Sequence, residues 1–300
     1  MTNPAVFVEF IIYKILSALF FFIPRPLCLL IGRQSGLLLY YLDRKHRRIA
    51  LSNLKMAFFR EFPESRWITI AKNSFAHFGE MTADILKLSH FSPERIQKLI
   101  SIEGQEHLHQ ALEDGKGALL FSAHIGNWEV GSAGVSRIAP LRVVVRALDN
   151  PLLEKELVRI RAKFGARVVY KQEAARKVLS SLRRNEAVAI LIDQNVLRSQ
   201  AVFVDFFGAP AATTPSLAAF SIKTGVPVLP TFCYPLPGGF FRLKVMAPVR
   251  TDLEGPNERD VLKITQICTK IIENEIRQNP SQWLWVHQRW KTRPFQRQRE

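Results

Sequence analysis

Hydrophobic residues follow two different patterns along the chain, and the pattern changes near residue 100. Residues 5–31 are strongly apolar, with Glu9 and Lys14 interrupting the first half of this stretch. A membrane-spanning helix needs about 20 apolar residues, so residues 4–23 can just cross a bilayer. Lying in the membrane interface is the alternative. The pattern therefore predicts an N-terminal apolar membrane-anchoring helix.

A second apolar helix is predicted at Leu37 to Leu42, and the basic run R-K-H-R-R follows it at residues 44–48. Basic residues beside an apolar segment are typical of a cytoplasmic, lipid-facing cluster. A solvated helix face and a nuclear-type basic patch are the alternatives. We place a boundary here, with residues 1–43 as membrane anchor and amphipathic segment and residues 44–300 as one α/β domain.

Beyond residue 100, short apolar runs alternate with amphipathic helical segments. Repeated β–α units of this length predict a mostly parallel central sheet flanked by helices, the α/β class. An antiparallel return strand is expected at residues 240–245, after Pro-Gly-Gly. Strands are expected at 118–123, 141–145, 166–170, 187–192 and 226–232, and helices at 64–90, 105–114, after 127, and at 152–164, 173–184 and 214–224.

The sequence G-A-L-L-F-S-A-H-I-G-N-W-E-V contains one of these strands, residues 118–123, which ends at His124. Gly126 and Asn127 are turn formers, and Asn127 can also cap a new helix, which would put Glu129 on its first turn. The expected geometry is strand, sharp turn and helix. In open α/β sheets, ligands bind outside the carboxyl ends of the strands, which is where His124 would lie.

His124 and Glu129 would lie about 140° apart on a continuous helix and could not meet. Across a turn they can meet, and the carboxylate could then hold the imidazole in one tautomer, as in a catalytic triad. Ser122 is nearby, but no serine or cysteine is clearly placed as a nucleophile, which suits attack by a hydroxyl of the substrate. A solvated turn is the alternative interpretation. No Cys/His cluster has zinc spacing.

Other polar residues also follow apolar strands. Arg146, Asp193 and Gln194 come at strand exits, Lys171 follows the next strand after Arg146, and Arg161 lies on the intervening helix. Side chains at the same ends of neighbouring strands would line one crevice. Arginine and lysine there could hold a phosphate or a developing oxyanion.

The charge balance, 42 − 26 = +16, implies an acidic partner such as nucleic acid, anionic lipid, a phosphorylated substrate or an acidic protein. The three cysteines, Cys28, Cys233 and Cys268, are few and far apart, which favours a reducing compartment without disulfides.

Two aromatic segments remain. The apolar segment at residues 206–210, F-F-G-A-P, is either a packed loop or the lining of an apolar groove. The run W-L-W-V-H-Q-R-W, residues 283–290, fits either a membrane surface or core packing. His287 is a poor catalytic candidate because no neighbouring residue in the sequence would orient it.

These motifs together resemble a known family. H-I-G-N-W-E resembles the H-x-x-x-x-D/E signature of the glycerolipid-type acyltransferase superfamily. Four segments resemble the late acyltransferases of lipid A biosynthesis, the lauroyl and myristoyl transferases. They are the N-terminal apolar stretch with R-R-I-A-L-S-N-L-K-M-A-F, then D-Q, F-F-G-A-P-A-A-T-T and W-V-H-Q-R-W-K-T-R-P. Asn195 departs from the acidic residue that follows D-Q in many members. The resemblance covers nearly the whole chain.

The resemblance implies an acyltransferase domain at residues 44–300, on the cytoplasmic side of a Gram-negative inner membrane. It implies acyl transfer from acyl carrier protein to a hydroxyl of a phosphorylated glycolipid, the lipid A precursor, with no metal or other cofactor. His124 would be the general base and Glu129 its orienter. The substrate and oxyanion site would include Asn127, Arg146, Arg161, Lys171, Asp193 and Gln194.

Two other functions stay open. One is a lysophospholipid or other glycolipid acyltransferase with the same chemistry. The other is a basic non-enzymatic protein that binds nucleic acid or membrane, although aromatic and basic residues interleave only near the C-terminus. We expect no nucleic-acid partner. The G-x-G-x-x-G and G-x-x-x-x-G-K-[ST] motifs are absent, so neither a dinucleotide fold nor a P-loop is supported.

Overall fold

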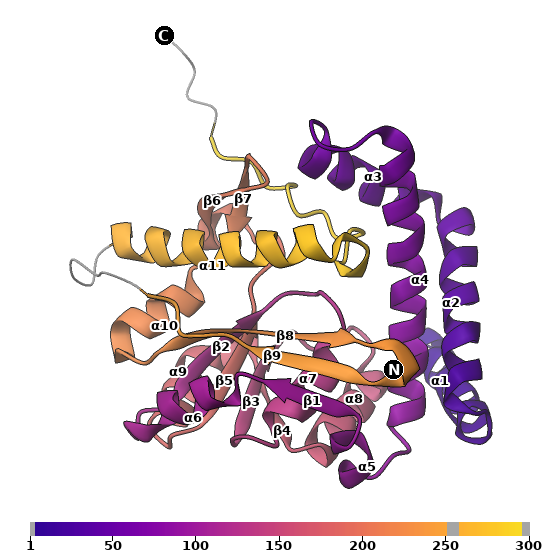
Figure 1. Cartoon of the computed structure of the whole chain (residues 1–300), viewed down its shortest axis with the longest axis horizontal. Helices are drawn as coiled ribbons and strands as arrows, with labels where there is room; N and C mark the ends of the chain where they lie inside the picture. Colours follow the sequence, from indigo (N-terminus) through magenta and orange to yellow (C-terminus); the bar gives the residue numbers. More distant parts are fainter. Residues whose placement is uncertain (1–3, 251–257, 296–300) are drawn as a thin grey trace.

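The computed structural model describes residues 4–250 and 258–295. At its centre is a seven-stranded sheet in the order β1-β9-β8-β2-β5-β3-β4 (Figure 1). Strands β8, β2, β5, β3 and β4 are all parallel, whereas β9 runs antiparallel to β8. The expected α/β class, the mostly parallel sheet and the antiparallel return strand are thereby confirmed. The division at residue 43 stays a prediction.

The strands are β1 (Ile100–Glu103), β2 (Ala118–Ser122), β3 (Leu141–Val145), β4 (Ala166–Tyr170), β5 (Ala187–Leu191), β6 (Val202–Phe206), β7 (Ala209–Thr213), β8 (Val228–Pro235) and β9 (Phe241–Val245). The helices are α1 (Pro4–Phe22), α2 (Arg25–Leu42), α3 (Arg44–Phe58), α4 (Glu64–Leu88), α5 (Pro93–Gln97), α6 (Gln105–Glu113), α7 (Trp128–Val135), α8 (Pro151–Lys163), α9 (Ala174–Leu182), α10 (Ser216–Thr224) and α11 (Glu258–Gln278).

Successive side chains of β2 enter two different hydrophobic cores. Leu119 and Phe121 pack with α3, α4, α9, α10 and α11 on one face of the sheet. Ala118 and Leu120 pack with α5, α6 and α7 on the other face. Because side chains alternate across a strand, a strand that is apolar at every position must be covered on both faces. The continuous apolar run of β2 thus specifies a central strand.

The N-terminal apolar stretch forms two helices that separate at Pro24, with Pro26 in the first turn of α2, where a missing N–H is tolerated. Helix α2 includes the expected helix at residues 37–42 and packs closely along α4. A Cβ atom at Gly32 would lie 2.4 Å from the carbonyl oxygen of Gly79, so this approach requires glycine. Helix α1 is long and apolar enough to cross a membrane.

The apolar segment at residues 206–210 is not a loop but part of the hairpin β6–β7. Phe206 pairs with Ala209, so the turn consists of Phe207 and Gly208, which have φ values of 56° and 75°. Positive φ at both central positions defines a type I′ hairpin turn, which Asn-Gly usually signals. Phenylalanine at the first position concealed this turn. Strand β1 and helix α11 were likewise not expected from the sequence.

Candidate active site

The turn after β2 presents His124 at the carboxyl edge of the sheet. Gly126 has φ 62°, and a Cβ atom there would lie 2.0 Å from the carbonyl oxygen of Cys233 on β8. The backbone N–H of Asn127 donates to that same oxygen at 2.8 Å. On the other side, Nε2 of the buried His77 on α4 lies 3.0 Å from the carbonyl oxygen of Gly126. Contacts from both a strand and a helix therefore fix the turn.

Asn127 caps helix α7, as its position in the sequence predicted. Its Oδ1 accepts the backbone N–H of Val130 at 3.1 Å. The Asn127 side chain is only 2% exposed, so the geometry gives it a helix-capping role and offers no support for the expected direct contact with substrate.

The imidazole of His124 is held by Asp193, which follows the neighbouring strand β5. Nδ1 of His124 lies 2.8 Å from Oδ1 of Asp193, and the backbone N–H of His124 donates to Oδ2 at 2.9 Å. A third donor, Nε1 of Trp283, reaches Oδ2 at 2.8 Å. The Asp193 side chain is only 2% exposed, so its contacts come from inside the protein.

These contacts keep the Asp193 carboxylate ionised because they lower its pKa. Burial alone would raise the pKa of Asp193, but the hydrogen bonds and charge of His124, with the Trp283 hydrogen bond, lower it to about 2. A carboxylate at Nδ1 keeps the proton on that nitrogen and leaves Nε2 as the nitrogen with the lone pair. Nε2 of Gln194 lies 3.3 Å from Nε2 of His124. The ring can thus act as a base at Nε2.

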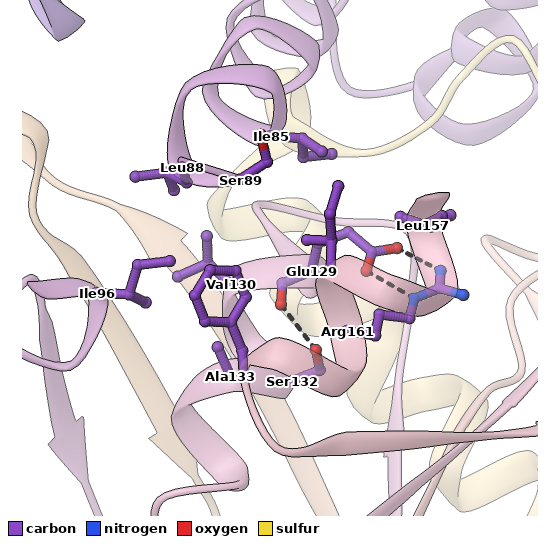
Figure 2. A pocket seen from close by; sticks show the side chains of 12 residues that line it. Ile85, Leu88, Ser89, Ile96, Glu129, Val130, Ser132, Ala133, Leu157 and Arg161 are labelled. Carbon is purple, nitrogen blue, oxygen red and sulfur yellow. Dashed lines mark hydrogen bonds and ion pairs between the residues drawn. The ribbon is translucent and has the colours of Figure 1, made fainter. Parts of the chain in front are cut away.

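Glu129 pairs with Arg161, whereas the sequence predicted a contact with His124. Its two carboxylate oxygens accept hydrogen bonds from Nε and Nη2 of Arg161, at 2.9 and 2.6 Å (Figure 2). Burial alone would lower the pKa of Arg161, but these hydrogen bonds raise it. The structure therefore brings His124 together with Asp193 and pairs Glu129 with Arg161. Glu129 lies in the first turn of α7, where a negative charge is favourable.

A small pocket adjoins the Glu129–Arg161 ion pair between α4, α7 and α8 (Figure 2). Its other walls are mostly apolar, and Ser132, which also lines it, donates to the carbonyl oxygen of Glu129 at 2.8 Å. The lining residues include Ile85, Leu88, Ile96, Val130, Ala133, Leu157, Ile160 and Phe164.

Arg146 and Lys171 lie at the same edge of the sheet but are not in contact with His124. Arg146 follows β3, and its exposed side chain pairs with Asp149 at 2.7 Å. Lys171 follows β4 and is also exposed. Strands β3 and β4 are the second and third strands from β2. At about 4.8 Å per strand, the exits of these strands are roughly 10 and 14 Å away from that of β2.

The C-terminal segment, residues 282–292, contacts both loops of the site, residues 124–127 after β2 and residues 193–195 after β5. The backbone N–H of Gly126 donates to the carbonyl oxygen of Gln282, and the backbone N–H of Leu284 donates to the carbonyl oxygen of His124. His287 accepts the backbone N–H of Asn195 at its Nε2, 2.8 Å away. This role was not predicted from the sequence. Burial lowers the pKa of His287, which favours the neutral ring that can accept this hydrogen bond.

The tryptophans of this segment are core residues. Trp283, Trp285 and Trp290 are at most 4% exposed, so the core-packing interpretation is confirmed and the membrane-surface interpretation is wrong. Asn53 on α3 donates to the carbonyl oxygens of Trp285 and His287, both at 2.7 Å. Asn53 thus joins two motifs that lie far apart in the sequence, R-R-I-A-L-S-N and W-L-W-V-H. The second motif begins with Trp283, which contacts Asp193.

No group of three or more His, Cys, Asp or Glu side chains that could hold a metal ion occurs within residues 4–250 and 258–295.

The family model of the bacterial lipid A biosynthesis acyltransferases matches residues 2–292. The chain belongs to this family. It is an acyltransferase, and the non-enzymatic alternative has no support from this match. The lipid A biosynthesis palmitoleoyltransferase of Escherichia coli strain K12 is 26% identical over 275 residues, 91% of this chain and 87% of that protein.

Other members are similarly distant. A lipid A biosynthesis acyltransferase of Haemophilus influenzae is 27% identical over 280 residues, 91% of this chain and 86% of that protein. A phosphatidylinositol mannoside acyltransferase of Mycobacterium tuberculosis is 28% identical over 223 residues, 72% of this chain and 69% of that protein. The chain is therefore similar to acyltransferases that are named for different lipid acceptors.

Proposed function

We propose that the protein transfers a fatty acyl chain from acyl carrier protein to a hydroxyl of a lipid A precursor, with His124 as general base. The observation that carries this proposal is the pairing of His124 Nδ1 with the buried Asp193 carboxylate, which leaves the proton-accepting lone pair on Nε2, beside the Gln194 amide at the carboxyl edge of the sheet. Family membership supports the reaction class. The His124 side chain is 19% exposed, so a substrate can reach it.

The reaction needs one proton transfer in each direction. Nε2 of His124 takes the proton of the acceptor hydroxyl while the hydroxyl oxygen attacks the thioester carbonyl carbon. The tetrahedral intermediate then collapses, the carbon–sulfur bond breaks, and His124 returns the proton to the departing sulfur. Asp193 stays ionised and stabilises the imidazolium that forms between the two steps. Asp193 therefore takes the orienting role that the sequence suggested for Glu129.

The oxyanion of the intermediate needs hydrogen-bond donors that are already in place. Two donors are candidates: the N-terminal amides of α7, directly after His124, and the Gln194 side-chain amide beside its ring. Glu129 and Arg161 join α7 to α8 through two hydrogen bonds. We infer that this ion pair holds the amino end of α7, and with it the candidate amides, in position.

The donor is expected to be a thioester on acyl carrier protein. The sequence contains no P-loop to activate a free acid, so the acyl group must arrive already activated. The net charge of +16 suits an acidic carrier protein. Exposed Arg146 and Lys171, at the same edge of the sheet as His124, suit the phosphates of the acceptor. The same charge suits a position on the cytoplasmic face of the inner membrane.

A donor and acceptor matrix tests this proposal. Purified full-length protein would receive the acyl group as carrier-protein or coenzyme A thioester, each with lipid A precursor or lysophospholipid. Transfer should be fastest for the carrier-protein thioester with lipid A precursor, and it should slow as salt screens docking. Preference for coenzyme A thioesters would contradict the donor, and preference for lysophospholipid would contradict the acceptor.

Another glycolipid is the second candidate acceptor, because the mycobacterial relatives are named for acylating phosphatidylinositol mannoside. Adding phosphatidylinositol mannoside to the acceptor matrix separates the two. Faster transfer to this mannoside than to lipid A precursor would favour the second candidate.

A further inference from the structure

The outer face of α1 is an exposed apolar stripe, with Lys14 at its edge. Side chains from Phe7 to Phe22 recur at i, i+1, i+4 and i+5 spacing, and those at Val8, Ile15 and Phe22 are 55%, 55% and 81% exposed. At about 100° per residue this spacing covers one half of the helix surface. The stripe is too long and continuous to be the ordinary scatter of exposed apolar residues on a soluble protein.

Helix α1 carries two charged residues, both exposed, and their side chains contact α8 or its N-cap residue Asn150. Oε2 of Glu9 accepts Nδ2 of Asn150 at 2.8 Å, and Nζ of Lys14 lies 2.8 Å from Oε1 of Glu156. These contacts therefore tie α1 to α8, although the Lys14 side chain stays 49% exposed.

The carboxyl end of α1 is fixed in the same way. The buried Lys87 on α4 donates to the carbonyl oxygens of Phe20 and Phe21 at 2.9 and 2.8 Å. His90 contacts Ser17 at 3.0 Å. From Glu9 to Phe21, polar contacts thus hold α1 against the α/β domain.

This attachment conflicts with α1 crossing a bilayer. Its 19 residues would span about 28 Å, nearly the whole hydrocarbon core of about 30 Å. Helix α8 would then be carried into the hydrocarbon beside it, with Glu156 and its other partner, Arg159. Helix α8 in turn packs on β4 of the sheet. Burying this charged surface in lipid is strongly unfavourable.

Helix α2 extends the apolar surface. Leu27, Leu30, Ile31 and Leu38 are 42–57% exposed. Figure 1 shows α1 and α2 on the same side of the molecule, outside α4. We call the exposed apolar faces of these two helices the docking plate. Exposed Arg44 and Lys45 follow directly after α2, so cationic side chains lie at the edge of the plate.

We propose that the docking plate enters one leaflet of an anionic bilayer, with α1 lying along the membrane interface rather than crossing the membrane. The apolar stripe is buried in the outer part of the leaflet, and the basic residues after α2 contact anionic headgroups. This inference rests on the membrane location proposed above, and it is independent of acyl transfer.

Depth-dependent fluorescence quenching tests the inference. An environment-sensitive fluorophore would be attached to V8C, I15C or F22C in the full-length protein, because the three native cysteines are buried. The vesicles would contain phosphatidylethanolamine and phosphatidylglycerol, with a spin label at a shallow or a deep acyl position. The labelled sites are about 10 Å apart along the helix. Q110C on α6, across the molecule in Figure 1, is the control.

All three α1 labels should show the same pattern, with stronger quenching by the shallow spin label, while the control is not quenched. A crossing helix would instead place position 15 deep in the bilayer and positions 8 and 22 near its surfaces. That pattern would overturn the inference but would leave the proposed membrane location intact. Absence of vesicle binding would overturn both. Equal binding to vesicles of phosphatidylcholine alone would overturn the requirement for anionic lipid.

A charge exchange tests the attachment of α1 to α8. Lys14→Glu alone should alter the quenching pattern by placing two carboxylates together, and Lys14→Glu with Glu156→Lys should restore it. If the single exchange leaves the pattern unchanged, α1 is not held by this pair and the inference fails.

Discussion

Asp193 binds His124 twice: Oδ1 lies 2.8 Å from Nδ1 of the ring, and Oδ2 accepts the backbone N–H at 2.9 Å. One buried carboxylate thereby fixes both the position of the residue and the tautomer of its imidazole. The contact joins the exits of β2 and β5, which are adjacent in the sheet. The structure thus brings together, from the ends of two neighbouring strands, the proposed base and its proposed orienting acid, which are 69 residues apart in the chain.

Asp193→Asn should lower kcat by about 10³- to 10⁴-fold while the protein remains folded. The amide can present an N–H to Nδ1, which favours the tautomer that has no lone pair at Nε2. Acyl transfer by the purified protein would be measured beside circular dichroism. Asp114→Asn is the matched control, because Asp114 is an exposed residue at the carboxyl end of α6. Similar rates for both variants would remove Asp193 from the mechanism.

Trp283→Phe should lower kcat roughly tenfold, because it removes one hydrogen bond to a buried carboxylate and keeps most of the aromatic packing. Trp285→Phe is the control: Trp285 packs against Trp283 but donates to the carbonyl oxygen of Pro280 rather than to Asp193. The comparison of kcat isolates the indole N–H. A larger loss in the Trp285 variant would show that packing, and not the hydrogen bond to Asp193, matters.

Glu129 and Arg161 should behave as one unit. Glu129→Ala and Arg161→Ala should reduce turnover by similar factors, and the double variant should be little worse than either, because each change breaks the same ion pair. Both side chains are less than 15% exposed, so a partner left unpaired also lowers stability, by about 3–5 kcal/mol. A double-mutant cycle on kcat and on unfolding is the measurement. Strictly additive losses in kcat would show that Glu129 acts independently of Arg161.

The low pKa of Asp193 also predicts a pH dependence of stability. Its pKa is lowered from 3.8 to about 2 in the folded protein, so its ionised form contributes about 2 kcal/mol above pH 4. That contribution is lost as the pH falls from 4 toward 2. Chemical unfolding in detergent would be compared between wild type and Asp193→Asn. The stability difference should change by about this amount below pH 4; a difference independent of pH would contradict the assigned ionisation.

Much of the fold could be predicted because β–α periodicity is a local property. The apolar run of residues 118–123 and the turn formers Gly126 and Asn127 specify strand, turn and helix without distant information. The hairpin β6–β7 was missed for the opposite reason. Its turn places Phe207 at positive φ, held by the surrounding structure, including a hydrogen bond from its N–H to Glu273.

The site was predictable only in part because strand order is not written in local sequence. His124, Asp193 and Gln194 were identified as polar residues at strand exits, but nothing local shows that β5 lies beside β2 while β3 and β4 lie beyond it. Glu129, close in sequence, therefore looked like the partner of His124. Trp283 was still harder to find, since its contact with Asp193 depends on the packing of the last segment of the chain.

The most direct test of the account is the rate of acyl transfer by purified full-length His124→Ala. Acyl carrier protein thioester and lipid A precursor would be supplied, with product detected by mass spectrometry. His109→Ala, an exposed position on α6, is the control for loss of an imidazole. The account predicts that His124→Ala folds normally and loses about 10³-fold or more in kcat, whereas His109→Ala keeps the wild-type rate. Near-normal turnover by folded His124→Ala would contradict it.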